Sequence, residues 1–272
     1  MKAREALNAA ARSLEAVSDT PRLDAELLMA HAVGVDRNTL ILSHLDTHSP
    51  AAFDPLLARR LAREPVAYIV GTRDFWTITL KVAPGVLIPR PDSETLIEAA
   101  MAHFGGHSPS RILDLGTGSG ALLLAALSEW PEATGIGVDA SQVAISIARD
   151  NAATLGLTPR ATVQEGDWAE GLAGIFDLIL CNPPYVETGA TLVPEVLNEP
   201  HEALFAGEDG LDDYRRLAPQ IGPLLSPRGC AVIEIGATQA GPTSALFEAA
   251  GFSVSIRKDL GGRDRCLVLT LT

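Results

Sequence analysis

The chain of 272 residues has few of the features that mark membrane-embedded and secreted proteins. Its longest apolar runs, such as residues 121–127, are far shorter than the roughly 18 residues that a membrane-spanning helix needs. The three cysteines, Cys181, Cys230 and Cys266, are odd in number and far apart, so neither a disulfide framework nor a zinc ribbon is expected. Residues 1–5 also lack the apolar core of a signal peptide. We therefore expect a soluble, cytoplasmic protein that makes no use of a membrane.

Metal-binding patterns are missing as well. Two histidine pairs have i,i+4 spacing, namely His44 with His48 and His103 with His107. Neither pair includes the carboxylate of a His-Glu-x-x-His motif, and the second encloses two glycines that disfavour a helix. The expectation is that the chain holds no metal.

Positive charge is scarce in the second half of the chain. Residues 1–110 carry 11 basic and 13 acidic side chains, which gives −2, whereas residues 111–272 carry 10 and 21, which gives −11. A protein that grips long nucleic acid usually has a basic stripe. The charge distribution therefore disfavours direct, sequence-specific binding of nucleic acid.

Residues 1–70 are predicted to form a small helical domain. Thr20-Pro21 is typical of an N-cap followed by proline at the first helical position, and Ser49-Pro50 repeats the pattern for a second helix. Between residues 71 and 90, β-branched and aromatic residues predict a β-hairpin that links two domains.

Residues 91–272 are predicted to form an α/β domain that carries the chemistry. The expected strands are 112–115, 135–139, 161–164, 177–181, 231–235, 252–256 and 266–271, and helices are expected at 95–104, 121–130, 141–155, 211–225 and 240–250. Ser141 is expected to cap the third of these helices. This alternation predicts a doubly wound, mostly parallel sheet of seven strands.

The most informative motif is Asn182-Pro183-Pro184-Tyr185, which follows the fourth predicted strand. The two prolines donate no backbone hydrogen bonds, hold φ at about −65° and keep the residue before each of them out of the helical region. The chain should therefore leave the sheet as a stiff, extended segment that presents carbonyl oxygens, an amide and an aromatic ring. Such a segment suits a planar group bearing an NH2, although the same residues also fit a merely rigid exit from a strand.

A glycine-rich turn joins the first predicted strand to the first helix of this domain. Because glycine lets the backbone approach a ligand closely, we assign cofactor binding to the stretch Gly116, Thr117, Gly118, Ser119 and Gly120. The next strand ends in Asp139, where an acid can accept both hydroxyls of a ribose. Such turns also occur without ligands. The spacing further fits the loose dinucleotide fingerprint, so an oxidoreductase is one alternative.

Asp167 and Trp168 follow the third predicted strand and should reach the same edge of the sheet. Trp168 is placed to stack on an adenine, with Asp167 accepting from the exocyclic amine. The alternative is a tryptophan that only caps the core. With Asp139 and Asn182, these residues predict one crevice for cofactor and substrate.

Over nearly all 272 residues, the chain resembles the HemK/PrmC-type protein-(glutamine-N5) methyltransferases that modify peptide chain release factors. The motifs that carry this resemblance are residues 71–76, 87–94, 114–120, 139, 167–168, 182–185 and 259–265. Pro-Arg-Pro-Asp-Ser-Glu together with Asn-Pro-Pro-Tyr is the diagnostic pair, whereas many amino-group methylases of DNA and RNA share the second motif alone. The resemblance implies a class I S-adenosylmethionine-dependent methyltransferase fold, with an N-terminal domain that helps to recognise the protein substrate.

The resemblance also implies roles for the candidate site residues. The glycine-rich turn, Asp139 and Trp168 would hold S-adenosyl-L-methionine, and Asn182 would meet both cofactor and substrate. As catalytic groups we expect Asn182 and Pro183, whose oxygens accept the two N–H groups of a glutamine amide, and Tyr185, which packs on that amide beside Pro184. The implied substrate is the glutamine of the Gly-Gly-Gln motif in release factors. The alternatives are a glutamine of a ribosomal protein, an amino group of adenine or guanine in nucleic acid, and a non-catalytic binding module.

Overall fold

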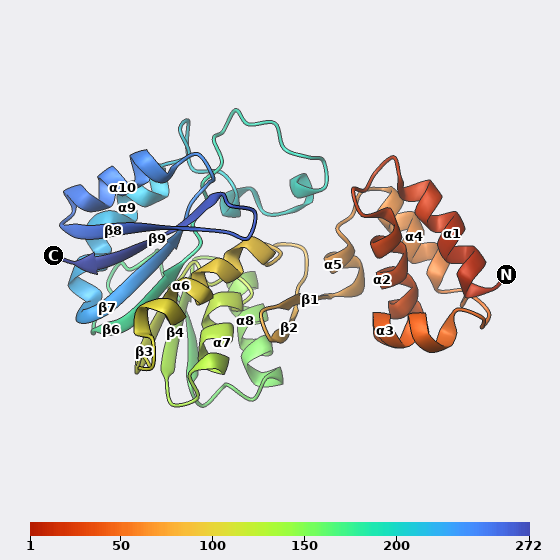
Figure 1. The fold of residues 1–272 in the computed structure, drawn as a ribbon, viewed down its shortest axis with the longest axis horizontal. Helices are drawn as coiled ribbons and strands as arrows, with labels where there is room; N and C mark the ends of the chain where they lie inside the picture. The colour runs from red at the N-terminus through yellow and green to blue at the C-terminus, as the bar shows by residue number, and fades with distance from the viewer. The chain divides into compact units, whose positions relative to one another are not determined.

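The computed structural model describes residues 1–272, and the chain divides into two compact units (Figure 1). The first unit comprises Met1–Thr72 together with the distant segment Leu192–Asn198. The second comprises Arg73–Thr191 and Glu199–Thr272. The chain therefore leaves the second unit once, contributes seven residues to the first, and returns.

The first unit is a bundle of short helices. They are α1 (Ala3–Leu14), α2 (Pro21–Val33), α3 (Arg37–Thr39), α4 (Phe53–Leu61) and α5 (Val66–Val70), with a π-helical turn at Leu40–His44. Their apolar faces meet in a core that includes Leu7, Leu14, Leu28, Met29 and Phe53.

One of the two predicted helix starts in this unit is confirmed. Helix α2 begins with Pro21 directly after Thr20, and Gly34 ends it in the left-handed conformation. The second prediction is wrong, because α4 begins only at Phe53 and Ser49-Pro50 lies in the preceding loop. Pro55 explains the difference. It falls in the first turn of a helix that begins at Phe53, where no N–H is needed, but it would break a helix begun near Pro50.

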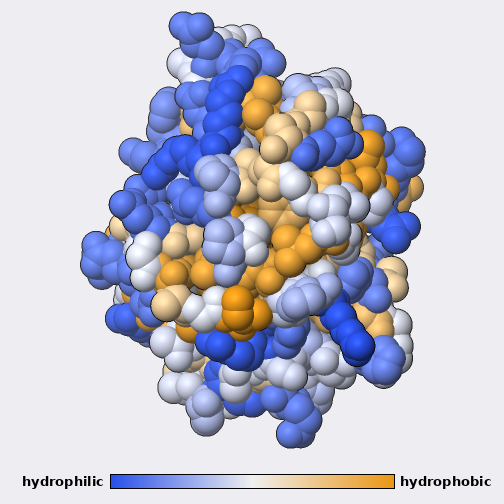
Figure 2. Space-filling view, turned by 90° about the vertical axis from the view of Figure 1, so that its left-hand side faces the viewer, coloured by the Kyte–Doolittle hydropathy of each residue, from blue (hydrophilic) through white to orange (hydrophobic).

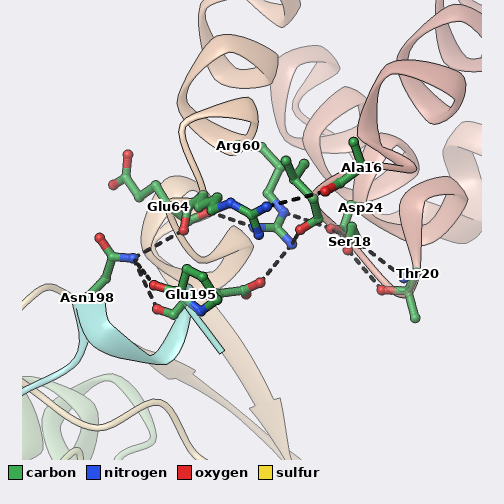
Figure 3. A network of polar contacts seen from close by, with 11 residues as sticks. Ala16, Ser18, Thr20, Asp24, Arg60, Glu64, Glu195 and Asn198 are labelled. Carbon is green, nitrogen blue, oxygen red and sulfur yellow. Dashed lines mark hydrogen bonds and ion pairs between the residues drawn. The ribbon is translucent and has the colours of Figure 1, made fainter. Parts of the chain in front are cut away.

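Arg60 is the centre of a polar network inside the first unit (Figure 3). Its Nε donates to Asp24 over 2.7 Å, and Asp24 also accepts from the hydroxyls of Ser18 and Thr20. Its Nη2 donates to Glu195 in the segment Leu192–Asn198, again over 2.7 Å. The side chain of Arg60 is only 3% exposed, so this charge depends on its partners.

The second unit is built on a seven-stranded sheet. Its strands are β3 (Arg111–Leu115), β4 (Thr134–Asp139), β5 (Ala161–Glu165), β6 (Phe176–Cys181), β7 (Leu225–Glu234), β8 (Phe252–Lys258) and β9 (Asp264–Leu271). The order is β5-β4-β3-β6-β7-β9-β8, and only the pairings of β9 are antiparallel. The predicted fold class, a mostly parallel sheet of seven strands, is confirmed.

Helices cover both faces of this sheet (Figure 1). Along β6, Leu178 and Leu180 pack on one face, and Ile179 and Cys181 on the other. The first face is covered by α6 (Glu94–Phe104), α7 (Ala121–Glu129) and α8 (Gln142–Thr154), and the second by α9 (Asp212–Ile221) and α10 (Ala240–Ala249). Because both faces are buried, the strands read as continuous apolar runs.

Three small elements precede the seven-stranded sheet in the chain. Strands β1 (Thr72–Phe75) and β2 (Ile78–Lys81) form a separate two-stranded sheet, and a 3-10 turn at Pro91–Ser93 leads into α6. The face seen in Figure 2 has apolar side chains gathered between polar ones. At the sheet edge, β8 ends in the exposed charges of Arg257 and Lys258, which disfavour pairing with another sheet.

All three cysteines, Cys181, Cys230 and Cys266, are free and buried. No group of three or more His, Cys, Asp or Glu side chains is arranged to hold a metal ion. None of the helices has the length and apolar character needed to cross a membrane.

Candidate active site

A cavity of about 630 Å³ opens at the carboxyl ends of β3, β4 and β6. The strand order reverses between β3 and β6, and in open α/β sheets ligands bind at such a point. The cavity volume falls within the range of small-molecule sites. Its lining includes Gly116, Thr117, Gly118, Ser119, Asp139, Asp167, Trp168, Asn182 and Pro184. Three other predicted site residues, Gly120, Pro183 and Tyr185, do not line it.

The glycine-rich turn after β3 is shaped by left-handed backbone. Gly116 and Gly118 have φ of 69° and 57°, values that side-chain-bearing residues rarely adopt. A Cβ on Gly116 would lie 3.0 Å from Cζ3 of Trp168, so the turn also needs glycine for close packing. The result is a backbone surface that a ligand can approach.

Asp114 fixes this turn from the strand side. Its Oδ2 accepts from the Thr117 hydroxyl over 2.6 Å and from the Leu123 N–H over 3.2 Å, which ties the turn to the start of α7. Complete burial raises its pKa to about 7, against the lowering effect of those two hydrogen bonds. Its Oδ1 is buried without any partner.

Asp139 projects from the end of β4 toward the turn. Its Oδ2 accepts from the Gly118 N–H and its Oδ1 from the Ser141 N–H, each over 2.8 Å. Each carboxylate oxygen can accept a second hydrogen bond. The side chain is therefore held rigidly and keeps acceptor capacity for a pair of hydroxyls.

Trp168 gives the cavity an aromatic wall. Its Nε1 donates to Asp213 over 3.1 Å, and its ring packs partly on the core of the second face. Beside it, Asp167 accepts from Arg216 over 2.6 Å. Asp213 and Arg216 both belong to α9 and line the cavity, and they were missed from the sequence because that helix showed no motif.

The Asn-Pro-Pro-Tyr segment leaves β6 with its two polar ends anchored. Asn182 Nδ2 donates to Ser93 Oγ over 3.1 Å, and the Tyr185 hydroxyl donates to Glu234 Oε1 over 3.3 Å. Burial raises the pKa of Tyr185, so its hydroxyl stays protonated and acts as a donor. Asn182 Oδ1 accepts no hydrogen bond from the protein, and Asn182 lines the cavity.

Ser93 and Glu234 are two further candidate residues that the sequence did not indicate. Ser93 Oγ donates to Glu234 Oε2 over 2.5 Å, and both residues are almost fully buried. Burial raises the pKa of Glu234 to about 7, although hydrogen bonds from Ser93 and Tyr185 and the charge of Arg265 act in the opposite direction. Their only signal in the sequence was the position of Ser93 in the Pro-Arg-Pro-Asp-Ser-Glu motif.

These residues suit S-adenosylmethionine. The left-handed glycines of the turn give a bare backbone surface, Asp139 offers acceptors of the kind that ribose hydroxyls need, and Trp168 offers an aromatic face. The roles assigned to individual residues stay predictions.

Models of two protein families match the chain. The methyltransferase small domain matches residues 91–208, and the PrmC N-terminal domain matches residues 5–71. The second unit, with its doubly wound sheet and its cavity at the β3–β6 reversal, is therefore a methyltransferase domain.

Three bacterial relatives, each named release factor glutamine methyltransferase, match most of the chain. The Caulobacter vibrioides protein is 43% identical, over 94% of this chain and 92% of its own length. The Rhodospirillum rubrum protein is 45% identical, over 92% and 79%, and the Cereibacter sphaeroides protein is 44% identical, over 97% of each. The chain belongs to the release factor glutamine methyltransferase family, as its motifs predicted.

Solved structures with lower identity share the fold. A methyltransferase from Pyrococcus furiosus has a TM-score of 0.55 at 17% identity, over 78% of this chain and 95% of that chain. The T. thermophilus 16S rRNA methyltransferase RsmC, solved with AdoMet and guanosine, has a TM-score of 0.52 at 21% identity, over 74% and 50%. Both likenesses concern the fold alone.

Proposed function

We propose that this chain transfers a methyl group from S-adenosyl-L-methionine to the side-chain amide nitrogen of the glutamine in the Gly-Gly-Gln motif of peptide chain release factors. The observation that carries the proposal is that Asn182, with an unpaired Oδ1, lines the same cavity as the glycine-rich turn and Asp139. Family membership supports the choice of substrate. Such a reaction belongs in the cytoplasm, where release factors act.

The chemical difficulty lies in the acceptor. An amide nitrogen is a poor nucleophile because its lone pair is delocalised into the carbonyl. Asn182 Oδ1 and the Pro183 carbonyl would each accept one N–H, which orients the nitrogen and offsets the positive charge that develops on it. When bound, S-adenosylmethionine supplies the methyl group on a sulfonium. As the new C–N bond forms, the C–S bond breaks, and the nitrogen then releases a proton to solvent.

Most of the acceleration would come from alignment. Holding two reactants in line can lower a barrier by about 7–11 kcal/mol, so no strong base is needed before transfer. The rigid Asn-Pro-Pro-Tyr segment suits that task, since its prolines restrict the backbone and both polar ends are anchored. The net charge of −11 over residues 111–272 would also favour the approach of a basic partner.

The test is methyl transfer to competing acceptors. The full chain is incubated with labelled methyl donor and, separately, with a release factor, a ribosomal protein, DNA and RNA. Label is expected on the release factor and is expected to vanish when the glutamine of its Gly-Gly-Gln motif is replaced by alanine. Label only on a ribosomal protein or on nucleic acid would overturn the proposal.

A further inference from the structure

Four side chains beside the cavity are joined by three consecutive hydrogen bonds. We call them the Glu234 network: Asn182, Ser93, Glu234 and Tyr185. Asn182 Nδ2 donates to Ser93, Ser93 donates to one oxygen of Glu234, and Tyr185 donates to the other. Both polar ends of the Asn-Pro-Pro-Tyr segment thus connect to a single carboxylate at the end of β7. Ser93 and Glu234 are 3% and 1% exposed, so water does not compete for the hydrogen bond between these two residues.

The network has a direction. An ionised carboxylate only accepts, so the single hydroxyl proton of Ser93 must point to Glu234. The oxygen of Ser93 is then left as an acceptor and can only receive an N–H from Asn182. This fixes the Asn182 amide with Nδ2 toward Ser93 and turns Oδ1 away from it. An Asn side chain without such a partner could present either end.

We propose that Glu234, acting through Ser93, is the positioning residue that makes Asn182 present its oxygen to the acceptor nitrogen. This inference rests on the proposed function, because an N–H of the substrate is what the oxygen must receive. Its consequence is selectivity for acceptors with an NH2. An acceptor that lacks the donor would leave the Asn182 oxygen unpaired.

Protonation of Glu234 would reverse the direction of the hydrogen bonds from Glu234 to Asn182. A protonated Glu234 donates to Ser93, and Ser93 can then donate to Asn182 Oδ1, so the amide turns over and offers Nδ2. Burial raises the pKa of Glu234 to about 7, so this change falls in an accessible range. The other titratable or charged groups that act on Glu234 or are acted on by it are Arg265, Asp92, Tyr185, Tyr214, Cys181 and Cys266.

The direct test is the side-chain amide signal of Asn182 in 15N-labelled protein, assigned by its absence in N182A. In the wild type, this signal is expected to shift with pH around a midpoint near the pKa of about 7. In E234Q it should not titrate, because a glutamine carries no proton in this range, and in S93A it should be displaced at every pH. The inference would be overturned if the Asn182 signal does not shift with pH in the wild type, or if it still titrates in E234Q.

Turnover on a release factor gives the second readout. For a single ionisation, kcat of the wild type should fall about tenfold per pH unit well below the midpoint, whereas E234Q should have a flat profile between about pH 6 and 8. S93A should lose about 100-fold in kcat with little change in KM for the methyl donor, the size of effect that follows misalignment of a reacting group. If kcat of both E234Q and S93A depends on pH as in the wild type, the inference is wrong, while the proposed function is unaffected.

Y214F is the matched control. The Tyr214 hydroxyl donates to the main-chain oxygen of Glu234 over 2.9 Å and does not touch its carboxylate. The variant should lose some stability yet keep the wild-type pH profile and Asn182 signal. If the wild type methylates no glutamine at all, the proposed function fails, and the titration of the Asn182 signal still shows whether Glu234 sets the orientation of the Asn182 amide.

Discussion

Arg60 Nη2 donates to Glu195 Oε2 over 2.7 Å, although 135 residues separate the two. Glu195 lies in Leu192–Asn198, which follows the Asn-Pro-Pro-Tyr segment in the chain and belongs to the first unit. Directly after it, Glu199 returns to the second unit and accepts from the Ile88 N–H over 2.9 Å. Glu195 and Glu199, four residues apart, are therefore each held by a partner from their own unit.

Replacing Asp24 by Ala should strongly destabilise the first unit. Arg60 and Asp24 are 3% and 8% exposed, and removing one partner of a buried pair costs about 3–5 kcal/mol. In D24A the buried guanidinium would keep only Glu195 as an acidic partner, and its Nε would lose the carboxylate that it donates to. Chemical denaturation would measure the loss. The matched variant is E195A, which removes the other partner, an acid that is 37% exposed. E195A should cost less than about 1 kcal/mol, since water replaces a lost partner near the surface, and equal losses in the two variants would contradict this reading.

Replacing Gly116 by Ala should weaken cofactor binding. The new Cβ would meet the Trp168 ring at 3.0 Å, and left-handed backbone costs a residue with a side chain about 1–2 kcal/mol. Gly34 provides a control, since it has φ of 81° but a Cβ added there would have no atom within 4 Å. Calorimetry with S-adenosylmethionine should therefore show reduced affinity for G116A and unchanged affinity for G34A. Equal affinities in both would show that the ring and the turn do not form the site.

Replacing Asp139 by Ala should cost the cofactor about 1.5–3 kcal/mol of binding free energy, the contribution of hydrogen bonds to a charged group. The variant also frees the Gly118 and Ser141 N–H groups, which would loosen the turn. An exposed acid of α8, Asp150, serves as the comparison because its carboxylate pairs only with Lys81. D150N should bind the cofactor like the wild type, and an unaffected D139A would remove Asp139 from the site.

Stability should depend on pH through Glu234. Its pKa is raised from 4.5 to about 7 in the folded chain, so the folded state holds the proton more tightly than the unfolded state. The associated stability is present below about pH 4.5 and is lost as pH rises through about 7, in total about 3 kcal/mol. The difference in unfolding free energy between wild type and E234Q should change by that amount across this range. A difference independent of pH would contradict the assignment. The corresponding difference between wild type and D114N should change with pH in the same direction, since burial also raises the pKa of Asp114.

The sequence predicted the architecture of the second unit because its strands and helices carry their own periodic patterns. Strand β7 shows where such patterns fail to predict the full length of an element. It spans Leu225–Glu234, but only its apolar end was predicted, since Pro227 and Gly229 normally mark turns. The start of helix α8, in contrast, was predicted correctly. Ser141 was expected to cap this helix, and its side-chain oxygen accepts the Ala144 N–H.

The site was predictable only where a local motif marked it. The Gly-rich turn, Asp139 and Asn182 each lie at the carboxyl end of a strand, so topology brings them to one edge of the sheet. Ser93 lies 89 residues before Asn182 and 141 before Glu234, and no spacing in the sequence links them. Side-chain contacts between such distant positions depend on the packed fold.

The most direct measurement is mass spectrometry of the release factor glutamine after incubation with the methyl donor and either wild type or N182A. We expect one added methyl group on the side-chain nitrogen with the wild type, and a loss of about 100-fold in rate with N182A, while calorimetry still detects bound cofactor. Near-normal transfer by N182A, or a methyl group on any atom other than that nitrogen, would contradict this expectation.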